Sequence, residues 1–194
     1  MARPALTTER IQLEPMTGAH LPLLLELDAD AEVMRFLTGR ARSAQEAEAF
    51  WAPVCADLTA DAVGLGWWVG RRRDNDDFVG WWDLSPDHPV SGRPSSAEVG
   101  WRLTRRNWRQ GLATEGAAAL LNHGFSTLGL SEVYAETMAV NEPSRRVMEK
   151  LGMRHLRTDH RSWDEPLPGA ERGEVVYAIT RDTWAGLRPP GLLD

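Results

Sequence analysis

A strand that leads through a short turn into a helix of small residues constrains this chain most. The segment AEVGWRLT, residues 97–104, alternates as a half-buried strand does, and WRQGLATEG, residues 108–116, then leads into a helix that begins near Gly111. The first backbone N–H groups of a helix have no partner within it, and the helix dipole adds partial positive charge there. Gly111 and Ala113 leave a phosphate free to approach these groups, and Thr114 adds a hydroxyl donor. The alternative is that the small residues only allow close packing of the helix on a sheet, and spacing alone does not decide.

Two better-known phosphate loops do not match this segment. A P-loop requires G-x-x-x-x-G-K-[ST], whereas Gly111 and Gly116 are followed by Ala117 and Ala118. A dinucleotide fingerprint requires G-x-G-x-x-G after the first strand of a βαβ unit, but here the first glycine is missing and the motif follows the fourth predicted strand. The segment therefore belongs to neither class.

The rest of the chain indicates one α/β (α+β) domain over residues 1–184, followed by a mobile tail at 185–194. The element order β-α-α-β-β-β-α-β-α-β-β gives a sheet of about seven strands and about four helices. The capping box of Ser43 and Glu46 marks one helix start. Further strands are expected within 9–15, 64–84, 133–138, 153–160 and 173–180, and further helices at 18–27, 31–37 and 141–152.

Composition excludes several classes of function. The formal net charge of −6 argues against a nucleic-acid partner, which normally meets a basic surface. One cysteine, Cys55, cannot form an internal disulfide, and no secretory signal or membrane-spanning run is visible, so we expect a cytoplasmic protein with no membrane partner. His155 and His160 are separated by an odd spacing that places them on opposite strand faces, so no metal site is expected.

The two segments AEVGWRL…NWRQGLATEG and VYAETMAVNEPSRRVMEKLGM together resemble the GNAT N-acetyltransferase family, in particular its RimJ/RimL-like branch. The pyrophosphate motif of that family is [RQ]-x-x-G-x-[GA], often W-G-x-G-x-A-T-E-A in this branch, and Arg109 stands where the branch often has Gly. The second motif, Asn-x-x-Ser leading to EKLGM, begins at Asn141. The residues that match the first motif are Trp108, Gly111, Ala113, Thr114 and Glu115.

The resemblance implies a GNAT fold, in which a mixed, mostly antiparallel central sheet splays between its fourth and fifth strands to hold acetyl-CoA. By resemblance, the pantetheine arm pairs with the backbone of the fourth strand, Asn141 hydrogen-bonds that arm, and the pyrophosphate rests on amides of the turn. Acetyl transfer is then direct attack of a neutral primary amine on the thioester. The residues assigned to acetyl-CoA are Trp101, Arg102, Leu103, Arg109, Gln110, Gly111, Leu112, Ala113, Thr114 and Asn141.

Two residues are assigned to catalysis. Ser144 matches the serine of Asn-x-x-Ser and is assigned to protonate the leaving thiolate; the alternative is an ordinary helix-capping residue. Glu98 is assigned as the base, or as the end of a water relay, because an alkylammonium with a pKa of about 10 must lose a proton. The alternative for Glu98 is a pair with Arg102 on the same strand face, and Glu136 is a second candidate base.

The acceptor side is less defined by the sequence. Nine tryptophans are present, and one ring of each doublet at 67–68 and 81–82 has to point away from the core. The acceptor is a peptide or small-molecule amine, or alternatively the chain is a non-catalytic acyl-CoA-binding regulatory module, and a homodimer is possible. The residues assigned to the acceptor are Trp68, Trp82, His160 and Trp163.

Overall fold

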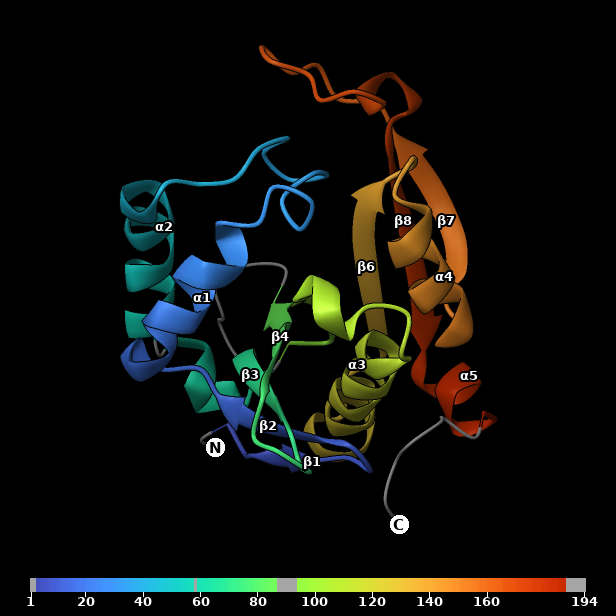
Figure 1. Cartoon of the computed structure of the whole chain (residues 1–194). Coiled ribbons are helices and arrows are strands. Elements are labelled where there is room, and N and C mark those ends of the chain that lie inside the picture. Colours follow the sequence, from blue (N-terminus) through green and yellow to red (C-terminus); the bar gives the residue numbers. More distant parts are fainter. Residues whose placement is uncertain (1–2, 58, 87–93, 188–194) are drawn as a thin grey trace.

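The computed structural model describes residues 3–57, 59–86 and 94–187 (Figure 1). Within them, one mixed sheet runs in the order β1-β2-β3-β4-β5-β6-β8-β7, and only β5 and β6 pair in parallel. The sequence predicts about seven strands, and the eighth is β1, whose two residues are too few to give an alternating pattern. The strands are β1 (Leu6–Thr7), β2 (Ile11–Pro15), β3 (Gly66–Arg72), β4 (Phe78–Pro86), β5 (Ser96–Leu103), β6 (Glu132–Met138), β7 (Arg154–Asp159) and β8 (Glu174–Thr180).

Helices cover both faces of this sheet (Figure 1). In the described part of the chain they are α1 (Leu21–Asp28), α2 (Ala44–Ala56), α3 (Leu112–Asn122), α4 (Glu142–Lys150) and α5 (Arg181–Ala185). The predicted capping box is confirmed, because Ser43 and Glu46 bond reciprocally at the start of α2. No described helix is long and apolar enough to cross a membrane.

The helix expected at 31–37 is wrong, because residues 31–38 form successive turns. The amides of Leu37, Thr38 and Gly39 all converge on the carbonyl of Met34. So short a segment gains few helical hydrogen bonds for the cost of nucleation, and Gly39 ends it with a positive φ of 71°. Of the tail expected at 185–194, Ala185 ends α5 and Leu187 packs near Gly152, while residues 188–194 lie outside the described range.

Two cores lie on opposite faces of the sheet. Strand alternation sends Trp68 and Trp82 into the main core beneath α3 and α4, and sends Trp67 and Trp81 into a second core beneath α1 and α2. In the second core the ring of Trp51 makes edge contacts with Trp67 and Trp81 at 5.5 and 5.6 Å between centroids. Each tryptophan doublet therefore anchors both layers of helices to the sheet.

The sheet divides between β5 and β6. Their parallel pairing covers only three residues of β5, from Ser96 to Glu98, whereas β5 pairs with β4 along its length to Leu103. Beyond Glu98 and its partner Tyr134 the two strands separate, and β6 is held by β8 instead. The predicted splay between the fourth and fifth strands is confirmed, since these strands are β5 and β6 once the short β1 is counted. The splay leaves the second half of β5 with no partner strand on its β6 side.

Candidate active site

The turn before α3 holds an unusual backbone conformation. Gly111 caps the helix with φ +82°, and Arg109 has φ +59°, also in the left-handed region that favours glycine. Arg109 therefore keeps the turn that the branch often builds with Gly. The side chain of Leu112 is buried and that of Ala113 is half-buried, so the first turn of α3 offers backbone N–H groups past small or inward-facing side chains.

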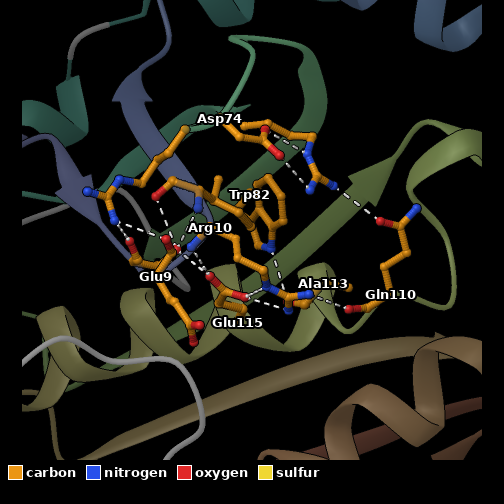
Figure 2. A network of polar contacts seen from close by, with 11 residues as sticks. Glu9, Arg10, Asp74, Trp82, Gln110, Ala113 and Glu115 are labelled. Atoms are coloured by element: carbon orange, nitrogen blue, oxygen red, sulfur yellow. Dashed lines mark hydrogen bonds and ion pairs between the residues drawn. The ribbon is translucent and has the colours of Figure 1, made fainter.

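The glycines of this segment have different purposes. An ideal Cβ on Gly116 would lie well inside 3.0 Å of the Trp82 ring, so this glycine allows α3 to pack on β4. The Trp82 indole also donates to the carbonyl of Ala113 at 3.1 Å (Figure 2). A Cβ on Gly111 would meet only Arg10 Nη2, at 3.4 Å, so Gly111 serves the turn. The packing interpretation is therefore confirmed for Gly116, and the phosphate-binding interpretation of Gly111 stays a prediction.

Arg10 ties this turn to the start of β2. Its guanidinium donates from Nε to Glu115 at 2.7 Å and from Nη1 to the carbonyl of Gln110 at 2.9 Å (Figure 2). Glu115 is 4% exposed and also accepts from the Thr8 hydroxyl at 2.6 Å, so its charge is neutralised inside the protein. Arg10 cannot be identified from the sequence, because it lies 105 positions from Glu115 and no local pattern links them.

Arginines surround the turn. Arg72 donates to the Gln110 side chain at 3.2 Å, and the amide nitrogen of Gln110 donates to the carbonyl of Arg106 at 2.7 Å. Gln110 is thus engaged through its side chain and its carbonyl. The side chain of Arg109 is exposed beside the start of α3. Unpaired helix amides and clustered guanidinium groups are the donor set that suits a pyrophosphate.

Asn141 and Ser144 form the start of α4, directly after β6. Asn141 Oδ1 accepts from the backbone N–H of Ser144 at 3.4 Å, and its Nδ2 donates to the Thr137 hydroxyl at 2.9 Å. The cap therefore uses the Ser144 backbone, and no hydrogen bond between described residues engages the Ser144 hydroxyl. The capping and catalytic interpretations are compatible, and the catalytic one stays a prediction.

A cleft of about 460 Å³ opens beside the split in the sheet. Glu98 enters it from β5 at the last paired position, and the 31–38 turns form another part of its wall. The lining residues are Phe36, Leu37, Glu98, Glu136, Thr137, Met138, Arg161 and Glu174. Glu98 and Glu136, the two carboxylates that the sequence proposes as bases, are thereby brought to one cleft.

The cleft is predominantly acidic. Arg161 bridges Glu136 at 2.8 Å and Glu174 at 2.9 Å. Partial burial, a hydrogen bond to Glu136 and the charge of Glu136 together raise the pKa of Glu174 to about 7. Because three carboxyl groups and one guanidinium line the cleft, it favours a positively charged group.

Asp83 lies behind Glu98 on the same face of the sheet, and no sequence motif points to it. Its side chain is 7% exposed and accepts from the Ser85 hydroxyl at 2.7 Å. Ser85 is the direct cross-strand partner of Glu98. Burial, with the neighbouring charge of Glu98, raises the pKa of Asp83 to about 7. An aspartate inside a strand gives no sign of this in the sequence.

Two of the four residues assigned to the acceptor lie elsewhere. Trp68 and Trp82 are 0% exposed in the main core, so they cannot line an open acceptor cleft. Alternation made one ring of each doublet face away from that core, but those rings are Trp67 and Trp81. Trp163 is 52% exposed and His160 is exposed, both in the loop after β7 that carries Arg161, and their acceptor role stays a prediction.

On β5, only the backbone is available to a ligand at several assigned positions. The Arg102 guanidinium is turned to Asp28 on α1 and lies over the Trp81 ring at 4.9 Å. Leu103 is buried, Trp101 packs against the main core, and Thr114 on α3 is largely buried. These positions agree with a role that requires backbone groups, and the ligand contact itself stays a prediction.

Comparisons with known proteins agree with this geometry. The family model described as "Acetyltransferase (GNAT) domain" matches residues 10–154. FsC-acetyl coenzyme A-N(2)-transacetylase of Aspergillus fumigatus is 39% identical over 98% of this chain and 82% of its own length. RimJ of Mycobacterium smegmatis, solved with CoA-disulfide, superposes with a TM-score of 0.72 at 23% identity over 92% of this chain and 87% of that chain. Spermidine N-acetyltransferase of Vibrio cholerae, solved with CoA and spermine, superposes with a TM-score of 0.71 at 15% identity. The match covers 90% of this chain and 98% of that chain.

Proposed function

Because the chain belongs to the GNAT family of N-acetyltransferases, we propose that it transfers the acetyl group of acetyl-CoA to a primary amine of a small molecule bound in the acidic cleft. The observation that carries this proposal is the position of the cleft, which opens where β5 and β6 separate and has Glu98 in its wall. The donor and the acceptor would thus meet at one point of the sheet.

The donor side is proposed from backbone groups that the chain leaves available and from side chains beside them. The backbone of β5 from Trp101 to Leu103 lacks a β6 partner, so the amide groups of a pantetheine arm would complete the ladder. The pyrophosphate would rest on the first amides of α3, reached past Gly111, with Arg109 adding charge. Asn141 would hydrogen-bond the arm from the other side of the split, at the end of β6.

The acceptor side follows from charge. An ammonium group entering the cleft meets Glu98 and Glu136, and Coulombic attraction favours that charge over an anionic one. The relative named as an N(2)-transacetylase supports a nitrogen atom as the acceptor. The family and this relative make the chain an N-acetyltransferase and not a non-catalytic regulatory module.

The reaction is a direct transfer within a ternary complex. Glu98 accepts a proton from the ammonium group, and the neutral amine attacks the thioester carbonyl. A C–N bond forms and the C–S bond breaks as the tetrahedral intermediate collapses. The attacking nitrogen then gives up its second proton to the leaving thiolate through the Ser144 hydroxyl, which donates its own hydrogen and accepts one in return. CoA leaves as a thiol, whose ordinary pKa is about 8.5.

The test has two stages. Calorimetry compares acetyl-CoA with S-acetylpantetheine, which lacks the pyrophosphate, and with ATP, which lacks the arm. We expect binding of acetyl-CoA at least ten-fold tighter than either, because both the turn and β5 are needed. Thiol release is then measured with panels of cationic, neutral and anionic amines, and Glu98→Gln serves as the base variant. Equal binding of all three donors, or thiol release that does not depend on an amine, would contradict the proposal.

A further inference from the structure

Asp83 differs from the other buried charges of the protein. Among the described residues, Arg3, Asp28 and Glu115 are also buried and charged, and each has an ion-pair partner: Asp61 for Arg3, two arginines for Asp28 and Arg10 for Glu115. No ion pair between described residues includes Asp83, whose side chain accepts from the Ser85 hydroxyl instead. A carboxyl group without a cation is expensive to ionise in such a place, so its position calls for a functional reason.

The sheet makes room for this carboxyl group. Asp83 is directly opposite Gly100 in the β4–β5 ladder, and an ideal Cβ on Gly100 would lie well inside 3.0 Å of Asp83 Oδ1. The carboxyl therefore lies over the backbone of β5, one cross-strand position from the pair of Ser85 and Glu98. Direct cross-strand partners have Cβ atoms about 5 Å apart, so Ser85, whose hydroxyl is bonded to Asp83, is the neighbour of Glu98 on the same face.

The surroundings of Asp83 are known on each side. The charged groups of β5 that face Asp83 are Glu98 and Arg102. Arg102 forms an ion pair with Asp28 of α1, and Arg42 forms a second ion pair with the same aspartate. From β3 the facing residue is Trp67, which closes the second core over this point. Glu98 alone of this group lines the cleft, so Asp83 reaches the acceptor only through it.

On the basis of the proposed function, we infer that Asp83 is a positioning residue for the base Glu98, a buried carboxyl that shares one proton with it through the Ser85 hydroxyl. Two coupled carboxyl groups lose their protons in two separated steps. The second step leaves both ionised, and in that state Glu98 is the stronger base because its neighbour is negative. The high pKa of Asp83, raised by burial, agrees with a second step near neutral pH.

Protons balance in this scheme. The acceptor ammonium loses two protons between binding and amide formation, and the leaving thiolate takes up one. One proton remains for each acetyl group transferred. Glu98 takes it from the ammonium, Ser85 accepts it while donating its own hydrogen to Asp83, and the proton returns to solvent through Glu98 after the product leaves. No oxidant or further reactant is required.

The first experiment measures kcat against pH at saturating acetyl-CoA with the best amine from the thiol-release panel. In the wild type we expect the acidic limb near pH 7. Asp83→Asn should move that limb at least one pH unit lower and reduce the plateau several-fold, since Glu98 loses its negative neighbour. Ser85→Ala should move the limb to higher pH, because the hydrogen bond that lowers the pKa of Asp83 is gone. Asp182→Asn, an exposed change on α5, is the matched control and should change neither.

Opposite shifts of the acidic limb in Asp83→Asn and Ser85→Ala distinguish a positioning role of Asp83 from a structural one. A uniform loss of kcat with an unmoved limb in both variants would overturn the inference, because mere loosening of the sheet lowers the rate at every pH. Asparagine has the shape of aspartate and removes a buried charge, so Asp83→Asn is expected to fold.

A second measurement does not need turnover. The carboxyl carbon of Asp83, assigned by its absence in Asp83→Asn, is followed by carbon-13 NMR between pH 4 and 9. Its midpoint should lie near neutrality and fall by about half a unit or more in Glu98→Gln. An unchanged midpoint in Glu98→Gln would overturn the coupling, whatever the acceptor turns out to be. Absence of amine acetylation with a shifted midpoint would instead reject the proposed function.

Discussion

Asp83 Oδ1 lies in the space that a side chain at Gly100 would occupy on the neighbouring strand. The two residues are direct partners in the β4–β5 ladder, and the absence of a Cβ on one allows the carboxyl of the other to lie flat on the sheet. A glycine in the middle of a central strand normally weakens the strand. At position 100 the side-chain packing is absent, and the Asp83 carboxyl occupies the space instead.

Gly100→Ala should destabilise the fold by about 1–3 kcal/mol, because the new methyl group overlaps a buried carboxylate. Adding Asp83→Ala should return part of that loss, since the overlapping atoms are then removed. Urea denaturation of the two single variants and the double variant measures the coupling. Strictly additive losses would mean that the two side chains do not compete for the same space.

Asp83→Asn should make the protein more stable at pH 8 and leave it unchanged near pH 4. The pKa of Asp83 is raised from an ordinary 3.8 to about 7, so the folded state holds a proton that the unfolded state releases, and wild-type stability falls between these two pH values. A shift of that size corresponds to about 4 kcal/mol. Urea midpoints from pH 4 to 8 test this, and a constant difference between variant and wild type would contradict it.

Gly111→Ala and Gly116→Ala should fail in different ways. The first places an alanine at φ +82°, which costs about 1 kcal/mol and disturbs the turn that we propose for pyrophosphate, so acetyl-CoA should bind several-fold more weakly. The second drives a methyl group into Trp82 and should lower the free energy of unfolding by about 1–3 kcal/mol. Calorimetry and urea denaturation on both variants give the comparison, and identical profiles would remove the distinction between the two glycines.

Ser144→Ala should lower kcat by ten-fold or more while acetyl-CoA binding stays within two-fold. The cap of α4 depends on the Ser144 backbone N–H and not on its hydroxyl, so the helix keeps its start. Thiol release gives kcat and calorimetry gives the affinity. Unchanged turnover would exclude Ser144 as the proton donor to the thiolate.

Arg10→Met should destabilise the protein by about 2–4 kcal/mol, because Glu115 then remains buried without its cation. Arg10→Met combined with Glu115→Gln should recover much of the loss, since the buried charge is removed with its partner. Thermal unfolding of both variants at pH 7 measures this. The double variant should still bind acetyl-CoA more weakly, because the carbonyl of Gln110 loses its tether.

Local rules predicted much of the fold. The box of Ser43 and Glu46 and the strand alternation around Val99 are set by neighbours within a few residues, so they can be read from the sequence. The two family motifs also located the turn at Gly111 and the start of α4. These features depend on contacts close along the chain.

Long-range pairing explains what could not be predicted. Alternation separates Trp67 from Trp68 but does not say which ring faces which core, because that depends on where α2 and α3 lie. Arg10 with Glu115, and Asp83 with its Gly100 space, depend on strand register between distant segments. The sequence therefore indicated a base on β5 but not the second carboxyl behind it.

The left-handed backbone at Arg109 has an evolutionary consequence. An L-residue in this conformation costs about 1–2 kcal/mol, and glycine would remove that cost. Glycine would also remove an exposed guanidinium from the turn. Selection for heat resistance and selection for affinity thus favour different residues at position 109. Laboratory evolution toward thermostability should replace Arg109 with glycine early, and the variant should bind acetyl-CoA more weakly.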